Sequence, residues 1–301
     1  MNQRQFKQIQ KVADTKKRQR EKQGRREKQA EVLVKDAKQV FRKLGTCSRT
    51  FFYLINREFG TSMEVEERAS DLLAGGIMKK GYQCGMLWGA SLAVGAEAFE
   101  VCAHRSQAIA VSIEATKILM DSFETHESTT QCREITKCDF ESKLSFAKYM
   151  ISGQFLHCFQ LAEDWAPDAV IKAKKALQDK PYDFEHAVSC ATEVAQKMGA
   201  SEKEMVMVAG FAGGLGLSGS ACGGLSAALW MNALNWCREH KAGSAIEDPK
   251  AKELMRSFKV FTDEKYLCQE ISQTHFNSVK EHTDYIKNGG CSELISALSQ
   301  I

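Results

Sequence analysis

Eleven cysteines are the residues of this 301-residue chain whose type and spacing could do chemistry, since a thiolate binds metals and attacks disulfides. Ten of them form pairs that keep the same order in the two halves of the chain, at offsets of 133 to 143 residues: Cys47/Cys190, Cys84/Cys222, Cys102/Cys237, Cys132/Cys268 and Cys158/Cys291. Ordered pairs at a nearly fixed period indicate a tandem duplication. The remaining cysteine, Cys138, has no counterpart.

A glycine-rich turn precedes one cysteine of each half. Its residues recur with identical spacing, Ala74-Gly75-Gly76, Gly81 and Cys84-Gly85 as Ala212-Gly213-Gly214, Gly219 and Cys222-Gly223. Glycine lets the backbone approach a bulky sulfur atom or cofactor closely. We therefore predict that the turns contribute to a cofactor site through eight glycines: Gly75, Gly76, Gly81, Gly85, Gly213, Gly214, Gly219 and Gly223.

The paired cysteines stand where helices are expected to begin. Cys47 follows Gly45-Thr46, Cys190 follows Ser189, and Cys291 follows Gly289-Gly290. The partial positive charge at a helix N-terminus stabilises a thiolate and lowers a thiol pKa below its usual value of about 8.5. Eight cysteines are predicted to be metal ligands or redox thiols: Cys47, Cys84, Cys132, Cys158, Cys190, Cys222, Cys268 and Cys291. For Cys102, Cys138 and Cys237 we expect a small buried hydrophobe instead.

Four thiolates in each half are compatible with three chemistries. An iron–sulfur cluster takes four cysteine ligands, which can be far apart in the sequence. Structural zinc also takes four, but its usual closely spaced pairs are absent, and so is the C-x-x-C spacing typical of dithiol exchange. The pattern favours an iron–sulfur cluster that transfers electrons to or from a redox partner protein. A metal-free dithiol oxidoreductase is the alternative, and a zinc site is less favoured than either.

The order of a helix-start cysteine, a Gly-Gly turn with Cys-Gly, and two later cysteines resembles the C_GCAxxG_C_C family of redox-active proteins. The resemblance covers nearly everything after residue 31, as two modules. The second matches best, through Cys190-Ala191, Gly210-Phe211-Ala212-Gly213-Gly214, Cys222-Gly223, Cys268 and Cys291. It departs at Gly224 and Ala227, and the first module has Met86 in place of the motif's alanine but retains Gly89. The resemblance implies a redox role for four cysteines in each module.

The elements that must position these cysteines are expected to be helices, because the chain has only three prolines and few β-branched runs. We predict an all-α fold, built as a tandem duplication of a module of four to six helices with Gly-rich turns. Helices are expected over Val32–Leu44, Cys47–Gly60, Val65–Leu73, Cys84–Phe99 and Ala108–Phe123. The predicted parts are a basic extension (1–30), a first module (31–167) and a second module (168–301), with the boundary between Pro167 and Pro181.

The stretch from Met205 to Cys237 carries no charge and is long enough to cross a membrane. Glycines divide it, and its counterpart carries Lys79-Lys80 at the same break. We therefore expect a buried pair of core helices and no transmembrane segment. Trp88, Trp230 and Trp236 lie on such apolar helices and are expected in the core.

Residues 1–30 hold eleven Lys and Arg against three acids, so this extension is strongly basic. The extension is expected to be solvated, or to contact an anionic membrane or nucleic acid through charge alone. In the second case, the chain would be a helical scaffold that docks through this extension. A homo-oligomer is also compatible with the sequence. No apolar leader follows the first residues, which favours a cytoplasmic location. His104, His157 and His240 lie beside cysteines and could ligate a metal or tune a thiolate, but we expect them to be ordinary surface or capping residues. No hydrolase, nucleotide or zinc-protease motif occurs.

Overall fold

The computed structural model describes residues 34–178, 184, 186–241 and 243–300. Within these ranges all regular elements are helices, and two isolated β-bridges are the sole strand-like pairings. The all-α prediction is confirmed. The first half contains α2 (Ala37–Leu44), α3 (Cys47–Phe59), α4 (Glu64–Ala69), η1 (Ser70–Leu73), α5 (Gly85–Val101), α6 (Arg105–His126), α7 (Cys132–Thr136), α8 (Lys143–Ile151) and α9 (Phe155–Gln178).

The second half repeats this order of helices. It contains α10 (Cys190–Lys197), α11 (Glu202–Met207), η2 (Ala209–Phe211), α12 (Gly223–Glu239), η3 (Ala245–Glu247), α13 (Pro249–Phe261), α14 (Cys268–Ser272), α15 (Val279–Lys287) and α16 (Ser292–Leu298). Helices α3 to α9 correspond to α10 to α16, so the predicted duplication is visible in the elements themselves. Three α-helices of the second half, α10, α13 and α16, are shorter than their counterparts. The largest change is at the last pair, where α9 has 24 residues and α16 has seven. Pro167 lies inside α9, which continues past it to Gln178.

Each glycine turn is a loop of left-handed backbone that closes on itself. In the first turn the φ angles from Gly75 to Lys79 are all positive, and the Gly81 N–H donates back to the Gly75 carbonyl at 2.9 Å. A Cβ atom on Gly76 would lie 2.3 Å from the Tyr82 nitrogen, so no other residue fits there. The loop therefore reverses the chain within a few residues and places Cys84 directly at the start of α5.

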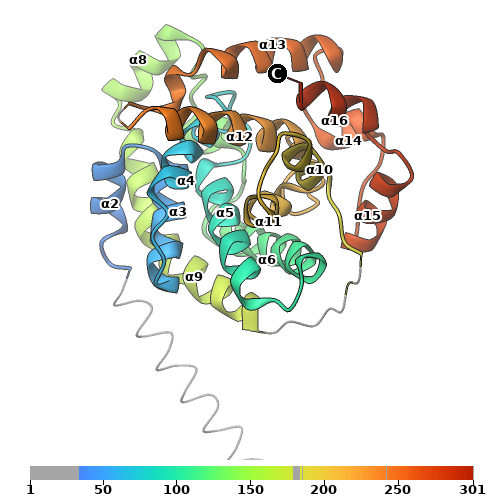
Figure 1. Ribbon diagram of the computed structural model, residues 1–301. Coiled ribbons are helices and arrows are strands. Elements are labelled where there is room, and N and C mark those ends of the chain that lie inside the picture. Colours follow the sequence, from blue (N-terminus) through green and yellow to red (C-terminus); the bar gives the residue numbers. More distant parts are fainter. Residues whose placement is uncertain (1–33, 179–183, 185, 242, 301) are drawn as a thin grey trace, which may run out of the picture.

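Helices α5 and α12 form the centre of a core that both halves share. Trp88 on α5 and Trp230 on α12 are fully buried, as predicted, whereas Trp236 is only partly buried at the edge of the core. The short α4 of the first half packs on α12, and α11 of the second half packs on α5 (Figure 1). A Cβ atom on Gly95 would lie 2.5 Å from the Val206 carbonyl oxygen, so glycine allows this close approach. The two halves thus exchange short helices and bury one continuous apolar core.

The glycine turns of the two halves also contact each other. The Gln83 side chain donates to the Gly214 carbonyl oxygen at 2.8 Å and accepts from the Ala221 N–H at 3.3 Å. Tyr82 and Tyr266 stack with ring centroids 5.5 Å apart. These bonds join the loops that carry Cys84 and Cys222, so neither loop can move without disturbing the other.

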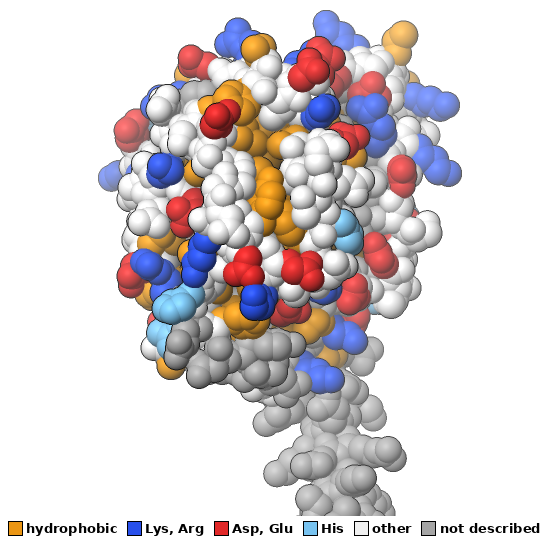
Figure 2. Space-filling model, turned by 90° about the vertical axis from the view of Figure 1, so that its right-hand side faces the viewer, with side chains coloured by type: hydrophobic (Ala, Val, Ile, Leu, Met, Phe, Trp, Pro, Cys, Tyr) orange, Lys and Arg blue, Asp and Glu red, His pale blue; other side chains and the backbone are white. Residues whose placement is uncertain are grey.

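The long apolar stretch is buried in the core, and charged side chains are spread over the surface. None of the helices in the described part of the chain is long and apolar enough to span a bilayer. Instead, the uncharged stretch from Met205 to Cys237 forms the end of α11, the glycine turn and most of the core helix α12, and it is buried as predicted. On the face opposite α2, Lys, Arg, Asp and Glu side chains are interspersed around a narrow apolar strip (Figure 2). The basic extension of residues 1–30 lies outside the described residues.

Candidate functional site

The four predicted cysteines of the first half line one cavity of about 490 Å³. Cys47 is the first residue of α3, Cys84 caps α5, Cys132 is the first residue of α7, and Cys158 lies in the first turn of α9. Their expected positions at helix starts are therefore confirmed. Side chains more than 100 residues apart along the chain come together because the glycine turn, α7 and α9 surround the N-terminus of α3.

Cys47 and Cys84 lie in the same cavity, and each affects the acidity of the other. Because the Cys84 thiol and the backbone N–H groups of Gly75 and Ser48 hydrogen-bond its sulfur, the Cys47 pKa is lowered to about 7. The same pair raises the Cys84 pKa well above its ordinary value, together with burial. A Cβ atom on Gly85 would lie 2.5 Å from the Cys47 sulfur, so the glycine after Cys84 is what lets the two thiols meet.

The other two cysteines of the first set are poorer acids. Burial raises the pKa of Cys132 well above its ordinary value and raises that of Cys158 to about 11. The Tyr149 hydroxyl lies 3.7 Å from the Cys158 sulfur, and Tyr285 stands at the same 3.7 Å from Cys291 in the second half. The sequence interpretation missed both tyrosines. A tyrosine shortly before the last cysteine of each half was the available signal.

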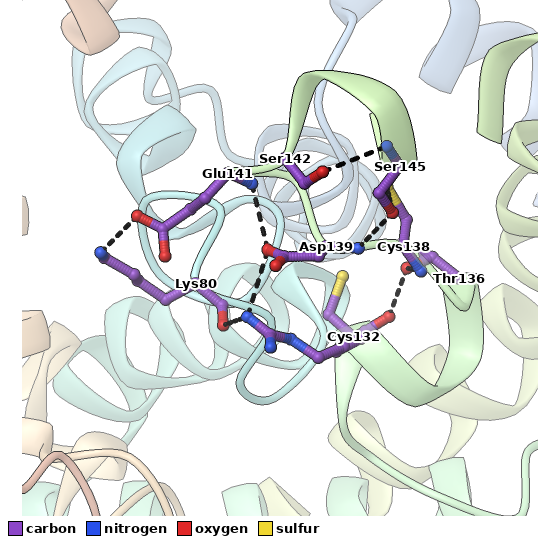
Figure 3. A network of polar contacts seen from close by, with 9 residues as sticks. Lys80, Cys132, Thr136, Cys138, Asp139, Glu141, Ser142 and Ser145 are labelled. Atoms are coloured by element: carbon purple, nitrogen blue, oxygen red, sulfur yellow. Dashed lines mark hydrogen bonds and ion pairs between the residues drawn. The ribbon is translucent and has the colours of Figure 1, made fainter. Parts of the chain in front are cut away.

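A polar network fixes the loop that connects Cys132 to α8 (Figure 3). Asp139 is its centre, accepting from Arg133 at 3.3 Å and donating its own N–H to Ser145 at 2.9 Å. Ser145 also lies 3.7 Å from the sulfur of Cys138, which is fully buried. Cys138 is thus a buried structural residue of this loop, as expected for a small hydrophobe, and the loop positions α8 over the cavity.

The cysteines of the second half also converge, but around far less space. Cys190, Cys222, Cys268 and Cys291 line a cavity of about 20 Å³, which is room for about one water molecule. Leu294, Ile295 and Leu298 of α16 and His282 of α15 line it as well and fill the volume that is open in the first half. No thiol–thiol hydrogen bond is present among the described residues of this set.

The expectation that a helix start lowers each thiol pKa is wrong for seven of the eight cysteines. Burial is the dominant cause in the second half, where it raises the pKa of Cys222 to about 11, that of Cys268 to about 12, and those of Cys190 and Cys291 as well. Desolvation of a thiolate in an apolar pocket exceeds the stabilisation by a helix N-terminus. Cys47 is the exception because a second thiol hydrogen-bonds it.

Some glycines of the turns lie next to the cysteines, and others shape the backbone of the turn. The backbone of Gly75 helps to lower the pKa of Cys47, and the backbone of Gly213 partly offsets the raised pKa of Cys190. Gly75 lines the first cavity and Gly223 lines the second. Gly76, Gly81, Gly214 and Gly219 have positive φ angles and shape the turns. Their predicted contact with a cofactor stays a prediction.

Two other expectations concern single residues. Cys237 is buried as expected, whereas Cys102 is only partly buried at the end of α5. His104 caps α6 as expected, accepting from the Gln107 N–H at 3.2 Å. His282 differs, since it is 1% exposed inside the second cavity and burial lowers its pKa to about 4. The sequence interpretation gave His282 no role, because no cysteine stands beside it in the sequence.

Within the described ranges, no three or more His, Cys, Asp or Glu side chains stand close enough together to hold a metal ion. The first set nevertheless has the donor atoms and the room for an iron–sulfur cluster, since four thiols border about 490 Å³. The second set has the donors without the room. Metal ligation by Cys47, Cys84, Cys132 and Cys158, or by their counterparts, stays a prediction.

The comparison with protein families agrees with this arrangement. A family model described as "Putative redox-active protein (C_GCAxxG_C_C)" matches residues 46–169 and again residues 185–301. Both matched segments contain one complete set of four cysteines and one glycine turn. No curated protein and no solved structure matches the chain.

Proposed function

Because the chain belongs to the C_GCAxxG_C_C family of redox-active proteins, as two tandem modules, we propose that it is a thiol–disulfide redox protein that works through Cys47 and Cys84. The observation that carries this proposal is that Cys47 and Cys84 line the same cavity, with the glycine after Cys84 directly against the Cys47 sulfur, and that the Cys84 thiol lowers the Cys47 pKa to about 7. Cys47 is also partly exposed, whereas Cys84 is buried, so a substrate reaches Cys47 first.

Cys47 is the attacking thiol in this proposal. A thiol attacks disulfides best when its pKa is near the ambient pH, because it is then both ionised and nucleophilic. Cys84 stays protonated while Cys47 is a thiolate, since its pKa is raised by that neighbour and by burial. Once Cys47 is bonded to substrate, its negative charge is gone, and Cys84 ionises more readily.

The proposed reaction reduces a disulfide-containing substrate. The Cys47 thiolate attacks one substrate sulfur, breaks the substrate disulfide and displaces the first substrate thiolate, which takes the proton of Cys84. The Cys84 thiolate then attacks the Cys47 sulfur and displaces the second substrate thiolate. The protein sulfurs lose two electrons and form a Cys47–Cys84 disulfide, and the substrate disulfide gains them. A dithiol of a redox partner protein restores the reduced pair.

Mass spectrometry after differential alkylation tests this proposal on the metal-free full chain. After brief treatment with a stoichiometric small disulfide, the Cys47–Cys84 disulfide is expected to form first and to be reversed by dithiothreitol. The Cys47→Ser variant should lose this reaction, whereas the matched second-module variant Cys190→Ser should keep it. Oxidation that appears first at another pair, or the same rate in Cys47→Ser, would overturn the proposal.

A second candidate function has its own supporting observation, the convergence of four thiols on a cavity of about 490 Å³. In it, Cys47, Cys84, Cys132 and Cys158 would hold an iron–sulfur cluster, which supplies one-electron transfer when bound. Tyr149 would donate a hydrogen bond to the sulfur of Cys158. Iron and acid-labile sulfide are then expected after anaerobic purification, with loss of both in Cys132→Ser, a variant that retains the Cys47–Cys84 pair. Iron-free protein that carries out the dithiol reaction would exclude the cluster as the working group.

A further inference from the structure

The wall of the first cavity is a row of aromatic rings. Phe41 and Phe159 meet edge to face at 4.8 Å between ring centroids, Phe159 and Phe155 at 6.0 Å, Phe155 and Tyr149 at 6.4 Å, and Tyr149 and Phe146 lie 6.3 Å apart. These rings come from α2, α8 and α9 and line the same cavity as the four thiols. Such a surface favours a flat apolar ring, which can stack on or meet the edges of these side chains.

Cations surround the mouth of this cavity. Arg42, Lys79 and Lys252 line it, all three are exposed, and none of the ion pairs found among the described residues involves them. Lys252 comes from the second module, so that module completes the first cavity. The Arg42 guanidinium lies 5.6 Å from the Phe159 ring centroid, at the end of the aromatic row. The positive charge is therefore placed next to the surface that would hold a ring.

The single acidic residue that lines the cavity does not neutralise these cations. Asp71 is buried, and its two oxygens accept hydrogen bonds from Thr46 at 2.6 Å and from Ser244 at 3.1 Å. Burial also raises the Asp71 pKa. An anionic group of a ligand would thus meet three cations without a competing exposed carboxylate.

Helix α8 forms an outer wall of the cavity and is lightly held. Tyr149 is its one buried residue, whereas Leu144 and Ile151 are 85% and 87% exposed. The helix has only sparse contacts with the other helices. A ligand that enters beneath α8 therefore has little packing to displace. A volume of about 490 Å³ is also in the range of small-molecule sites, which is about 300–1,000 Å³.

We propose that the first cavity binds a flat, apolar ring compound that carries an anionic group. The ring lies against the aromatic row, and the anion faces Arg42, Lys79 and Lys252. Resting on the proposed function, the substrate is then a disulfide with an anionic aryl substituent, whose sulfur atoms reach Cys47 while its charge stays at the mouth. The second cavity, of about 20 Å³, cannot take such a compound.

Binding of the ring and the anion is tested without any redox step. Fluorescence titration of the reduced, metal-free full chain compares anilinonaphthalene sulfonate with phenylnaphthylamine, which has the same rings and no sulfonate. The sulfonate is expected to bind about tenfold more tightly, and the difference should shrink as salt is raised. Removing the three cations together (Arg42→Gln, Lys79→Gln, Lys252→Gln) should abolish this preference.

A matched control removes three exposed lysines elsewhere on the surface (Lys175→Gln, Lys197→Gln, Lys287→Gln) and should keep the preference, although the net charge falls equally. Phe146→Ala should weaken both probes, and Phe146 is 44% exposed, so this variant is expected to fold. Equal binding of the two probes, or equal effects of the cavity and control variants, would overturn the proposed ligand class.

A second experiment measures rates of disulfide reduction, so that the proposed ligand class and the proposed thiol function can fail independently. Stopped-flow rates with dithiobis(nitrobenzoate), an anionic aryl disulfide, are compared with those of neutral dithiodipyridine and cationic cystamine, each relative to its rate with free glutathione. The anionic aryl disulfide should be favoured by about tenfold in wild type and lose that advantage in the cavity variant. Preferred sulfonate binding with no dependence of these rates on Cys47 would support the ligand class and overturn the thiol function. Rates that depend on Cys47, with no preference for the sulfonate, would support the thiol function and overturn the ligand class.

Discussion

The two cysteine sites of this chain come from one duplicated module but differ in what surrounds their sulfur atoms. Both have a glycine turn, four cysteines at helix starts and a tyrosine 3.7 Å from the last sulfur. The first encloses about 490 Å³, whereas the second encloses about 20 Å³. In the first, the long α9 and the outer α8 leave space beside Cys47. In the second, the short α16 brings leucine and isoleucine side chains onto the thiols.

This difference teaches that the cysteine framework and the chemistry it can perform are separable. The framework depends on the glycine turn, which both modules keep. The acidity of a sulfur atom depends on hydrogen bonds and burial, which differ between them. The second site, which is filled by apolar side chains, therefore resembles a part of the hydrophobic core. The first site, with its open cavity and acidic thiol, has the features of a reactive site.

The largest expected effect is on thiol chemistry. Cys47→Ser should lower the rate of disulfide reduction by about 100-fold or more, because the nucleophile is removed. Cys190→Ser, the matched change in the second module, should leave the rate within about twofold, as its thiol has a raised pKa and is buried. Stopped-flow kinetics at neutral pH measures both. A large loss in Cys190→Ser would break the distinction between the sites.

A packing change should affect the second site more than the first. Leu298 is 2% exposed and its side chain lies against the second set of cysteines, so Leu298→Ala should lower the free energy of unfolding by about 3 kcal/mol. Phe146→Ala in the first cavity should cost about 1 kcal/mol or less, because 44% of Phe146 is already exposed to solvent. Urea unfolding of both variants checks this. Similar losses would mean that the first cavity is part of the stabilising core.

His282 gives the second site an acid sensitivity that the first lacks. Its pKa is about 4 in the folded protein against an ordinary value of about 6.5, so the unfolded chain binds more protons between these values. Stability is then fully present above about pH 6.5 and falls by about 2–3 kcal/mol as pH is lowered to about 4. His282→Phe, which introduces the residue found at the matching position of α8, should lose this part of the pH dependence.

Urea unfolding between pH 7 and pH 4 measures that slope, and the reciprocal variant Phe146→His is its control. Position 146 is exposed, so a histidine there should titrate with its ordinary pKa and leave the pH dependence unchanged. An unaltered slope in His282→Phe would show that other groups cause the loss of stability in acid.

The smallest effect concerns the pKa of Cys47. Its alkylation by iodoacetamide should increase with pH around a midpoint of about 7, since the thiolate is the reacting form. In Cys84→Ala the strongest hydrogen bond to the sulfur is lost, and the midpoint should move up by about one unit, towards the usual value of about 8.5. Cys222, whose pKa is raised to about 11, should stay unreactive throughout this range. An unchanged midpoint in Cys84→Ala would contradict the role given to the thiol pair.

Much of the fold could be predicted from local patterns. The paired cysteines, the repeated Gly-Gly turns and the apolar stretches gave the duplicated all-α architecture, and the helix start at Cys190 follows from its capping neighbour Ser189. Even there, details depended on tertiary contacts. The Thr46 side chain donates to Asp71 at 2.6 Å and leaves the N-terminus of α3 without a side-chain cap.

The amino-acid sequence by itself determined which cysteines converge and which turns bring them together, because helix starts and left-handed glycines act over a few residues. Only the tertiary structure decided that Cys47 is the acidic thiol, that Lys252 from the other module reaches its cavity, and that His282 is buried. The physical reason is that pKa values and cavity volumes depend on which side chains surround a sulfur atom. Those neighbours come from distant parts of the chain.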